Sequence, residues 1–375
     1  MLHRISKRIL LSIAIVSAVC IHAMAQAPTD KPIRVVIVGL VHDHARGFIG
    51  PLSKNTNVQL VGISEPDTAL AAHYESQFHL DHKLFYTDMD KMLDQLHPDA
   101  VLVYTDIADH RKVIEDAAKR GINSMVEKPL ATTMADAIAI RATAREHHVQ
   151  VLVNYETTWY SSNAEAIRES DAGKLGPIRR VVVHDGHEGP KEIGVSPTFL
   201  NWLADPEKNG AGAMFDFGCY GADLMTVLMH GETPLSVTAV AQTDKPDIYP
   251  HVDDDATIII RYPHAQAVLM PSWNWTFSRK DMEVYGTKAY AIAVNPTQVK
   301  TRTSEHGAEE ETTATPLVPP EDTSLHYLAA VVRKQLDPKD DLTGLATNMT
   351  VVQILDAARH STAEGKTIML HPLPN

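Results

Sequence analysis

A run of β-branched residues that ends in glycine, PIRVVIVGL at residues 32–40, recurs in similar form at residues 57–65, 98–106 and 122–129. Helical patterns separate these runs, for example DTALAAHYESQF and DHRKVIEDAAKRG. Apolar strands without polar alternation are typical of a parallel sheet buried on both faces, and regular alternation with helices indicates a doubly wound topology. We therefore predict an α/β fold whose first domain, residues 31–153, is a Rossmann-type parallel sheet.

The second half of the chain has a different order of secondary-structure patterns. Strand patterns such as LSVTAVAQT, DATIIIRYP and DMEVYGTKAYAIAV follow one another with turn residues but no long helices between them. This predicts an α+β domain over residues 154–375, with a large, mostly antiparallel open sheet that is covered on one face. The helical stretch at 347–365 is expected to pack back on the first domain, and the acidic, Thr- and Pro-rich segment 304–322 is expected to be an exposed loop.

The first 25 residues have the pattern of a cleavable signal peptide. Basic residues precede an apolar run at 9–20, and Ala23-Met24-Ala25 forms an A-x-A cleavage site. The run is too short for a membrane-spanning helix. We expect an exported, periplasmic or secreted protein without a membrane segment after cleavage at Ala25, by either the Sec or the twin-arginine route. Cleavage leaves Cys219 as the single cysteine, so no internal disulfide is expected.

The charge balance excludes some partners. The full chain carries a formal net charge of −13, and removal of the leader with its three basic residues makes it −16 (−13 − 3). An acidic protein of this kind is not expected to bind nucleic acid or anionic membranes.

The first strand leads into GLVHDHARGF, where a dinucleotide-binding fold normally has G-x-G-x-x-G. Gly39 keeps the first glycine, but Val41 and His44 occupy the other two positions. His42 and His44 either replace the glycines by donating to a pyrophosphate or crowd the cofactor. Glu65, 26 residues after Gly39 (65 − 39), is placed to bind a ribose diol and favours NAD over NADP, although it could also be a solvated turn residue.

The stretch VEKPLA at 126–131 resembles the glucose–fructose oxidoreductase/inositol dehydrogenase (Gfo/Idh/MocA) family. YTDMDKML, PDAVLV, GPIRRV, GAGAMFDFGCYGADL and STAEGKTIML agree with that family in the same order, over nearly the whole chain after the leader. The resemblance implies an NAD-binding first domain and a second domain whose open sheet often forms a dimer interface. A homo-oligomer is therefore expected. The predicted cofactor-binding set is Gly39, Val41, His42, His44, Glu65, Thr105, His110, Glu127 and Lys128; for His110 a structural role is an alternative.

The family resemblance also implies a catalytic set, namely Lys128, Asp216 and Tyr220. Relatives commonly show D-x-G-x-H-x-x-D, and here Tyr220 replaces the histidine that takes the proton. A spacing of four and three residues places Asp216, Tyr220 and Asp223 on one helical face. A phenol is about 3 pKa units too weak as a base at neutral pH, roughly 4 kcal/mol, and a nearby Lys128 ammonium would supply part of this. Alternatively, Tyr220 is a structural residue in an inactive relative.

Further polar residues lie where a substrate would bind. The predicted substrate-binding set is Asn154, Glu156, Trp159, His184, His187 and Asp223, and no metal is expected. The sequence thus predicts an exported NAD-dependent dehydrogenase acting on a hydroxyl of a carbohydrate. One alternative is a glycoside hydrolase or lyase that oxidises its substrate transiently and recycles NAD. The other is a sugar- or NAD-binding protein without catalysis.

Overall fold

The computed structural model describes residues 31–373 of the 375-residue chain, and residues 32–373 belong to one compact unit. The predicted signal peptide, residues 1–25, lies outside the described residues. The first half contains β1 Ile33–Val38, α1 His44–Leu52, β2 Val58–Ser64, α2 Thr68–Phe78, η1 His82–Leu84, β3 Phe85–Tyr86, α3 Met89–Leu96, β4 Ala100–Val103, η2 Ile107–Asp109, α4 His110–Ala118, β5 Asn123–Glu127, α5 Met134–Glu146, β6 Val151–Asn154 and η3 Glu156–Trp159.

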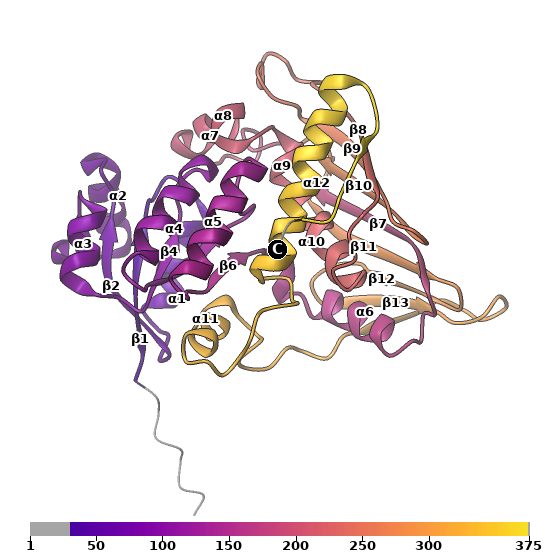
Figure 1. Ribbon diagram of the computed structural model, residues 1–375, viewed down its shortest axis with the longest axis horizontal. Helices are drawn as coiled ribbons and strands as arrows, with labels where there is room; N and C mark the ends of the chain where they lie inside the picture. The colour runs from indigo at the N-terminus through magenta and orange to yellow at the C-terminus, as the bar shows by residue number, and fades with distance from the viewer. Residues whose placement is uncertain (1–30, 374–375) are drawn as a thin grey trace, which may run out of the picture. The chain divides into compact units, whose positions relative to one another are not determined.

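Six of these strands form one parallel sheet in the order β3-β2-β1-β4-β5-β6. The predicted Rossmann-type sheet is thereby confirmed. The chain order reverses between β1 and β4, and in such sheets ligands bind beyond the carboxyl ends of the strands at this point. Helices lie on both sides of this sheet (Figure 1).

Side chains at the N-termini of α2 and α5 cap these helices. Asp67 accepts from the amides of Ala69 and Leu70 at the start of α2, and Thr133 accepts from Asp136 at the start of α5. Such caps satisfy amides that have no partner within the helix. The local sequence therefore fixes where α2 and α5 begin.

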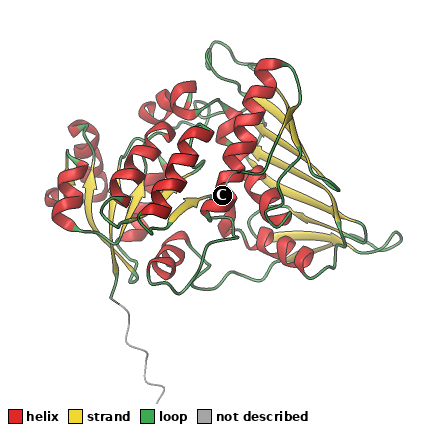
Figure 2. Ribbon diagram, viewed as in Figure 1, coloured by secondary structure: helices red, strands yellow, loops and turns green. Residues whose placement is uncertain are grey.

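The second half contains α6 Ser161–Asp171, β7 Ile178–Gly186, α7 Pro197–Leu203, α8 Pro206–Asn209, α9 Ala213–Asp216, α10 Gly218–Leu228, β8 Ser236–Gln242, β9 Asp255–Arg261, β10 Gln266–Ser272, β11 Arg279–Gly286, β12 Tyr290–Ala293, β13 Gln298–Arg302, β14 Glu310–Thr313, α11 Ser324–Val332, α12 Leu345–Glu364 and β15 Ile368–Met369. Nine strands form a sheet in the order β14-β13-β12-β11-β7-β10-β9-β8-β15. Every pairing is antiparallel except that of β7 with β10, which confirms the predicted mostly antiparallel sheet. Helices cover one face only (Figure 2).

The segment 304–322 is not a loop throughout, as predicted, because residues 310–313 form the edge strand β14. Its four residues are all exposed, as expected for a polar edge strand. Thr312 and Thr313 suit a strand because β-branched side chains favour an extended backbone. The composition indicated exposure correctly, but the pairing with β13 could not be read from it.

Helix α12 connects the two halves. It packs against α10 and β8 on one side and against α5 and β6 on the other, as Figure 1 shows. Its buried residues are distributed around the helix, including Met349, Val352 and Leu355. One continuous hydrophobic cluster therefore extends from the first sheet to the second. The boundary between domains at residue 153 stays a prediction.

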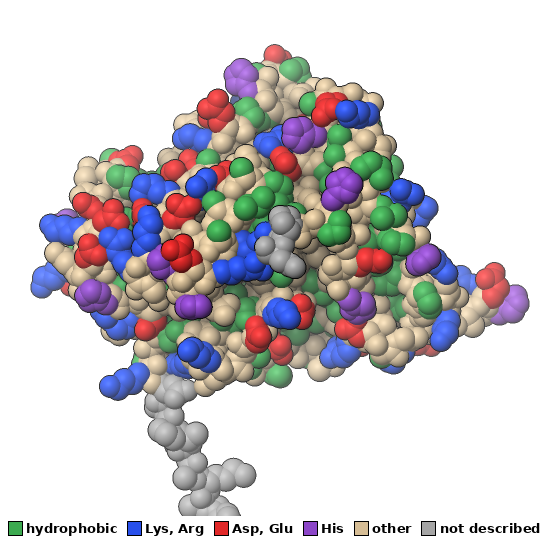
Figure 3. Space-filling model, viewed as in Figure 1, with side chains coloured by type: hydrophobic (Ala, Val, Ile, Leu, Met, Phe, Trp, Pro, Cys, Tyr) green, Lys and Arg blue, Asp and Glu red, His purple; other side chains and the backbone are tan. Residues whose placement is uncertain are grey.

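Charged side chains of both signs are mixed on the surface of the protein. Acidic and basic side chains lie interspersed over the helices of the first half on the face shown in Figure 3. None of the helices in the described part of the chain combines the length and apolar character that a membrane span requires.

Candidate active site

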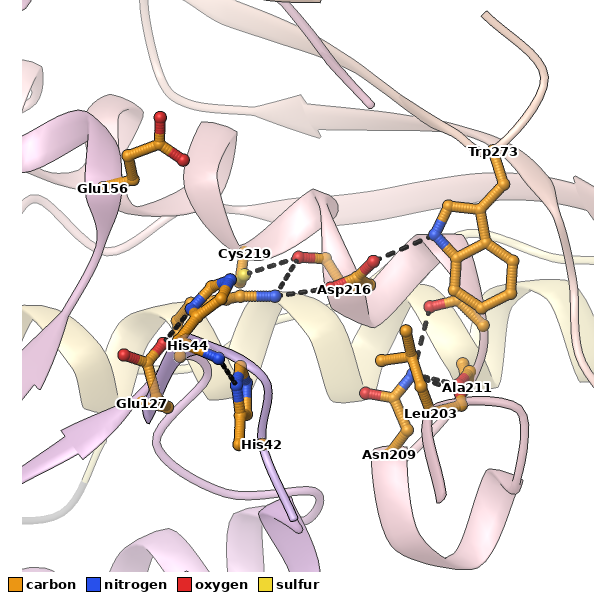
Figure 4. A network of polar contacts seen from close by, with 12 residues as sticks. His42, His44, Glu127, Glu156, Leu203, Asn209, Ala211, Asp216, Cys219 and Trp273 are labelled. Carbon is orange, nitrogen blue, oxygen red and sulfur yellow. Dashed lines mark hydrogen bonds and ion pairs between the residues drawn. The ribbon is translucent and has the colours of Figure 1, made fainter. Parts of the chain in front are cut away.

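A buried ion pair joins the two halves at the carboxyl edge of the first sheet. Lys128 directly follows β5, and Asp216 is the last residue of α9. The Lys128 ammonium forms an ion pair with Asp216 Oδ1 and donates to the Asp216 backbone carbonyl over 3.0 Å. Trp273 Nε1 donates to the other carboxylate oxygen over 2.9 Å, and Figure 4 shows the indole pointing toward Asp216. The carboxylate is thus held from two sides.

Both members of the pair stay charged at neutral pH. Burial by itself lowers the pKa of Lys128, but the neighbouring Asp216 carboxylate more than offsets this and raises it above the usual value. Burial likewise raises the pKa of Asp216, but the Lys128 ammonium and the Trp273 hydrogen bond bring it below its usual range. Lys128 therefore keeps its ammonium charge, balanced by Asp216, despite a side-chain exposure of only 5%.

Tyr220 lies next to this pair. Its ring centroid is 5.4 Å from Lys128 Nζ and 5.0 Å from Lys280 Nζ, so two ammonium groups flank the ring. The hydroxyl makes no hydrogen bond to any described residue. Burial raises the pKa of the phenol well above 10. The expected lowering by Lys128 is not found, because Asp216 neutralises the lysine charge and the ring is buried; Tyr220 is therefore protonated at neutral pH.

The predicted single helical face of Asp216, Tyr220 and Asp223 is wrong in part. Phe217 separates α9, which ends at Asp216, from α10, which begins at Gly218. Asp223 is fully buried inside α10, and its carboxyl has no partner among the described residues. The charge that acts on its pKa is Asp341, not Lys128. The helix break changes the direction of the side chains, so Asp223 does not join the Lys128 pair.

A polar cavity of about 460 Å³ borders the site, lined among others by Glu156, Tyr160, His187 and Lys280. Glu156 forms an ion pair with Lys280 and accepts from the Tyr160 hydroxyl over 2.6 Å. His187 Nδ1 accepts from the Gly189 amide over 3.0 Å, which leaves the ring proton on Nε2. Burial lowers the pKa of His187, so this imidazole is neutral. Of the predicted substrate-binding residues, the structure brings Glu156 and His187 to this cavity.

Two other predicted residues lie elsewhere. His184 hydrogen-bonds Asp281 over 2.8 Å and packs edge-on against Trp275. Because successive strand residues point to opposite faces, His184 faces away from the side of β7 on which Val183 contacts α10. Trp159 packs against Tyr327 and lines a separate cavity of about 350 Å³. Neither ring borders the cavity beside Lys280.

Trp273 and Lys280 were missed from the sequence, whereas Asp185 was expected near one strand end with His184 and His187 but was not included in the predicted substrate-binding set. Asp185 shares the inner face of β7 with Val181 and Val183, and the alternation in VVVHDG could have indicated this. Lys280 and Trp273 come from strands whose position next to the site depends on sheet order. For these two residues the sequence offers no local signal.

The β1–α1 turn has the geometry of a phosphate-binding turn in part. Gly39 has φ +81°, and a Cβ atom there would lie 2.8 Å from the Thr105 backbone nitrogen and 2.9 Å from the Tyr104 carbonyl oxygen. Only glycine fits this approach. The amides of Val41 and Asp43 donate to no described residue, which leaves donors for an anion at the start of α1.

Glu65 is more buried than a ribose-binding residue needs to be. Its carboxylate accepts from the Leu40 amide over 2.8 Å and from the Asp67 amide over 2.9 Å, and only 2% of the residue is exposed. It nevertheless lines a cavity of about 620 Å³ at the ends of β2 and β3. The residues that line this cavity do not include the turn residues with free amides. Direct contact of Glu65 with the ribose stays a prediction.

A hydrogen-bonded group lies at the β1–α1 turn and consists of His42, His44 and Glu127 (Figure 4). The His44 amide donates to His42 Nδ1 over 3.2 Å, and His44 Nδ1 donates to Glu127 over 2.9 Å. Their ligand-type atoms lie within 4.8 Å of one another, a spacing that a metal ion also takes. These hydrogen bonds place the His42 proton on Nε2, which is then a donor and not a metal ligand. We assign no metal here.

The Glu127 carboxylate is also hydrogen-bonded to the end of β6, where the first half of the chain leads into the second. Asn154 donates to Glu127 over 3.1 Å and accepts from Trp159 Nε1 over 3.1 Å. Asn154 and Trp159 thus support Glu127, while their predicted contact with substrate stays untested. His110 is fully buried and donates through Nδ1 to the Leu130 carbonyl over 3.2 Å, which is consistent with the structural alternative.

Helix α7 covers the β1–α1 turn. Trp202 Nε1 donates to the Val41 carbonyl over 3.1 Å, and the Ser196 amide donates to Asp43 over 2.7 Å. The His42 ring packs against Phe199 and Trp202, with centroid distances of 4.7 and 5.3 Å. The Val41 backbone and the His42 side chain therefore contact the second half of the chain. This contact was not predicted from the sequence.

Comparison with known proteins adds to this geometry. The model of the Gfo/Idh/MocA oxidoreductase family, with an NAD-binding Rossmann fold, matches residues 33–155, and that of the C-terminal domain matches residues 164–292. Trans-1,2-dihydrobenzene-1,2-diol dehydrogenase of Xenopus laevis is 24% identical over 311 residues, 80% of this chain and 88% of that protein. Aldose-aldose oxidoreductase from Caulobacter crescentus, complexed with glycerol, has a TM-score of 0.76 at 22% identity, covering 91% of this chain and 100% of that one. An inositol dehydrogenase homologue from Azotobacter vinelandii, complexed with NAD⁺, has a TM-score of 0.79 at 18% identity, covering 92% and 98%.

Proposed function

Because the chain belongs to the Gfo/Idh/MocA family of NAD-binding oxidoreductases, we propose that it transfers a hydride between a nicotinamide and a hydroxyl-bearing carbon of a sugar or sugar derivative. The observation that carries this proposal is the buried Lys128–Asp216 pair at the carboxyl edge of the first sheet, next to Tyr220 and a polar cavity. The names of the relatives, a diol dehydrogenase and an aldose oxidoreductase, support a hydroxylated substrate.

The cofactor-binding turn and the Lys128–Asp216 pair have distinct roles in this proposal. A bound nicotinamide dinucleotide supplies the site that gives or accepts the hydride. Gly39 and the free amides of Val41 and Asp43 hold its phosphates, and the cavity beside Glu65 holds its adenosine. Lys128 stabilises negative charge on the substrate oxygen, because its ammonium remains charged in a site with little water. Asp216 holds this ammonium in place.

Tyr220 acts as a proton donor or acceptor, depending on direction. Its phenol is protonated at neutral pH, since burial raises its pKa. In carbonyl reduction it therefore donates a proton to the oxygen that receives negative charge. In oxidation it must first lose its proton, so the rate of oxidation is expected to rise with pH up to at least pH 10.

The proposed test uses purified protein and a matched pair of lysine variants. Small molecules released by denaturation are analysed by mass spectrometry for NAD, and the NADH absorbance is followed with a panel of sugars and polyols. Lys128→Met is expected to lose about 10²-fold or more of the turnover rate. Lys119→Met serves as control, because Lys119 is 57% exposed and pairs only with surface Asp116. If no nicotinamide is bound or used, or if both variants retain full activity, the proposed reaction is wrong.

The same assay separates the hydrolytic alternative. A glycoside hydrolase that oxidises its substrate transiently would release the aglycone without a net change in NADH absorbance. We propose net hydride transfer. Release of the aglycone from an aryl glycoside, without a net change in NADH absorbance, would contradict this proposal.

Export and assembly complete the proposal. We propose that residues 1–25 direct the protein out of the cytoplasm, and that the dinucleotide then stays bound, because a free supply outside the cell is not evident. We also propose a homo-oligomer formed through the helix-free face of the nine-stranded sheet, on which Val240 is 67% and Ile259 37% exposed. Mass photometry of wild type and Val240→Glu tests the second point, and N-terminal sequencing of the secreted protein tests the first.

A further inference from the structure

A second cavity lies outside the proposed active site. It has a volume of about 350 Å³, and none of the described residues that line it also lines the cavity beside Lys280. Its wall is largely apolar and includes Ile167, Val227 and Leu342, which come from α6, from α10 and from the segment before α12. Cavities of this size and character are the usual sites of small organic ligands. Hydride transfer gives this second cavity no role.

Two aromatic rings form one side of the second cavity. The ring centroids of Trp159 and Tyr327 are 5.7 Å apart, and their planes are inclined at 60°. Trp159 Nε1 donates to Asn154 over 3.1 Å. The Tyr327 hydroxyl donates to Asp341. Because both polar atoms are in use, a ligand meets the carbon surface of the rings, which binds apolar groups and organic cations.

The rim of the second cavity is acidic. Asp171, Glu321 and Asp340 line it and are exposed, and Arg168 is the one lysine or arginine among the described lining residues. Arg168 already forms an ion pair with Glu165. With three carboxylates and one arginine that is already paired, the rim favours a cationic ligand over an anionic one.

A buried hydroxyl in the second cavity has no partner. Thr158 Oγ1 is shielded from solvent and makes no hydrogen bond within residues 31–373. Buried polar side-chain atoms are normally hydrogen-bonded, because leaving one unpaired costs free energy. A ligand with a donor or an acceptor would remove this cost.

The short helix η3 connects the second cavity with the proposed active site. Its first residue, Glu156, lines the polar cavity of about 460 Å³. Its last two residues, Thr158 and Trp159, line the second cavity. A ligand that packs against the end of η3 therefore acts on an element that also borders the active site.

Hydrogen bonds extend this connection to the cofactor-binding domain. Trp159 donates to Asn154, and Asn154 donates to Glu127, each over 3.1 Å. Glu127 also accepts from His44 at the β1–α1 turn over 2.9 Å, and it directly precedes Lys128. The position of the Trp159 ring is thus linked to the first turn of the NAD-binding domain.

We propose that the second cavity is a regulatory site for a small organic amine that carries an aromatic or other apolar ring. The ring packs against Trp159 and Tyr327, and the ammonium group lies among the carboxylates of the rim. By holding Trp159, the amine fixes Asn154 and Glu127 in their hydrogen-bonded arrangement. Bound amine is therefore expected to tighten NAD binding, since order that the first ligand imposes need not be imposed by the second.

Three indoles that differ in charge test the class of ligand. At pH 7 tryptamine is cationic, tryptophol is neutral and indole-3-propionate is anionic, and the binding of each to the purified protein is measured by calorimetry. Tryptamine is expected to bind about 10-fold tighter than tryptophol, and indole-3-propionate more weakly than either. Equal affinity for the three indoles, or no binding, would overturn the site.

Substitutions at the rim and in the wall locate the bound amine. Asp171→Asn combined with Glu321→Gln keeps the side-chain volumes and is expected to weaken tryptamine about 5–10-fold, with tryptophol unchanged. Ala164→Leu narrows the cavity and is expected to weaken all three indoles about 10-fold. Glu146→Gln, at the exposed end of α5, is the control and is expected to bind like wild type. Tryptamine affinity that the double variant leaves unchanged would place the amine elsewhere and refute the proposal.

Regulation is tested by calorimetric titration of NAD, after removal of bound nucleotide by filtration, with and without saturating tryptamine. NAD affinity is expected to rise about 5-fold or more, and NAD must raise tryptamine affinity by the same factor, because coupling between two sites is reciprocal. Asn154→Leu removes the link between Trp159 and Glu127 at similar volume. This variant is expected to bind tryptamine as wild type does but to lose the coupling.

Two outcomes would refute regulation through η3 and Asn154. They are an NAD affinity that tryptamine leaves unchanged or lowers in wild type, and a coupling that persists in Asn154→Leu. None of these readouts involves turnover, so failure of this site and failure of the proposed hydride transfer are distinguishable.

Discussion

The pair of Lys128 and Asp216 makes a quantitative prediction for Asp216→Asn. Asparagine has nearly the same volume and keeps an oxygen for Trp273 Nε1, so the main change is the loss of one negative charge. The Lys128 ammonium then stays buried with a single hydrogen bond, to the backbone carbonyl of residue 216. Removing one member of a buried ion pair typically costs about 3–5 kcal/mol, because the other charge is left without compensation.

This loss has a defined pH dependence. In wild type the pKa of Asp216 is lowered and that of Lys128 is raised. The carboxylate stabilises the fold above its unfolded pKa of about 4 and loses this effect as the pH falls through its lower folded pKa. The ammonium stabilises it below its unfolded pKa of about 10.4 and loses this effect as the pH rises through its higher folded pKa. The difference between wild type and Asp216→Asn is therefore expected to be largest between about pH 5 and pH 10.

Thermal and denaturant unfolding at pH 7 measure the effect. With about 2.1 cal/mol/K of unfolding entropy per residue over a chain of 375 residues, 3–5 kcal/mol corresponds to a midpoint shift of about 4–6 °C. Asp223→Asn is the matched control, because Asp223 is equally buried but has no cationic partner and is protonated at neutral pH. It is expected to change stability by less than about 1 kcal/mol.

A double-mutant cycle with Lys128→Met isolates the interaction. The double variant is expected to be more stable than the sum of the single losses implies, with a coupling of about 3 kcal/mol. A loss below about 1 kcal/mol for Asp216→Asn, or a coupling near zero, would refute the reasoning, since the ammonium would then have another source of compensation.

Three further changes have expected outcomes. Tyr220→Phe is expected to lower carbonyl reduction about 10²–10⁴-fold while NAD affinity, measured by fluorescence titration, stays the same; equal loss of NAD binding would argue against a role as acid. Gly39→Ala is expected to cost about 1–3 kcal/mol in denaturant unfolding, because alanine is strained at φ +81° and its Cβ meets the backbone, whereas Gly47→Ala in α1 meets no atom within 4 Å and should not destabilise. Trp202→Phe removes a hydrogen bond to the β1–α1 turn and is expected to lower the free energy of unfolding by about 1 kcal/mol. It is also expected to speed the release of bound NAD, which is measured by dilution and filtration. Unchanged release would show that α7 does not retain the cofactor.

The first sheet was predictable because its pattern is local. Most of its strands are largely apolar runs, and α2, α3 and α5 start at the capping residues Asp67, Asp88 and Thr133. Residues at the carboxyl ends of parallel strands share one edge, so Gly39 and Lys128 could be placed at a ligand-binding edge without coordinates. The family resemblance then added Asp216 and Tyr220 as their partners.

The contacts between segments far apart in the chain could not be predicted. The pairing of Lys128 with Asp216 was expected as proximity but not as a buried ion pair, and the protonated state of Tyr220 follows from burial that no spacing reveals. Likewise, the cover of the β1–α1 turn by Phe199 and Trp202 depends on where a helix of the second half lies.

The amino-acid sequence by itself determined the alternation of strands and helices, the edge at which a ligand binds, and the identity of the lysine there. Local periodicity and capping are sufficient for these, since they depend on neighbours within a few residues. The tertiary structure decided which charges are compensated. Lys280 and Asp185 meet opposite one another because β11 pairs with β7 across almost a hundred residues. Sheet order and burial set such partners, and neither is encoded in the spacing of the residues concerned.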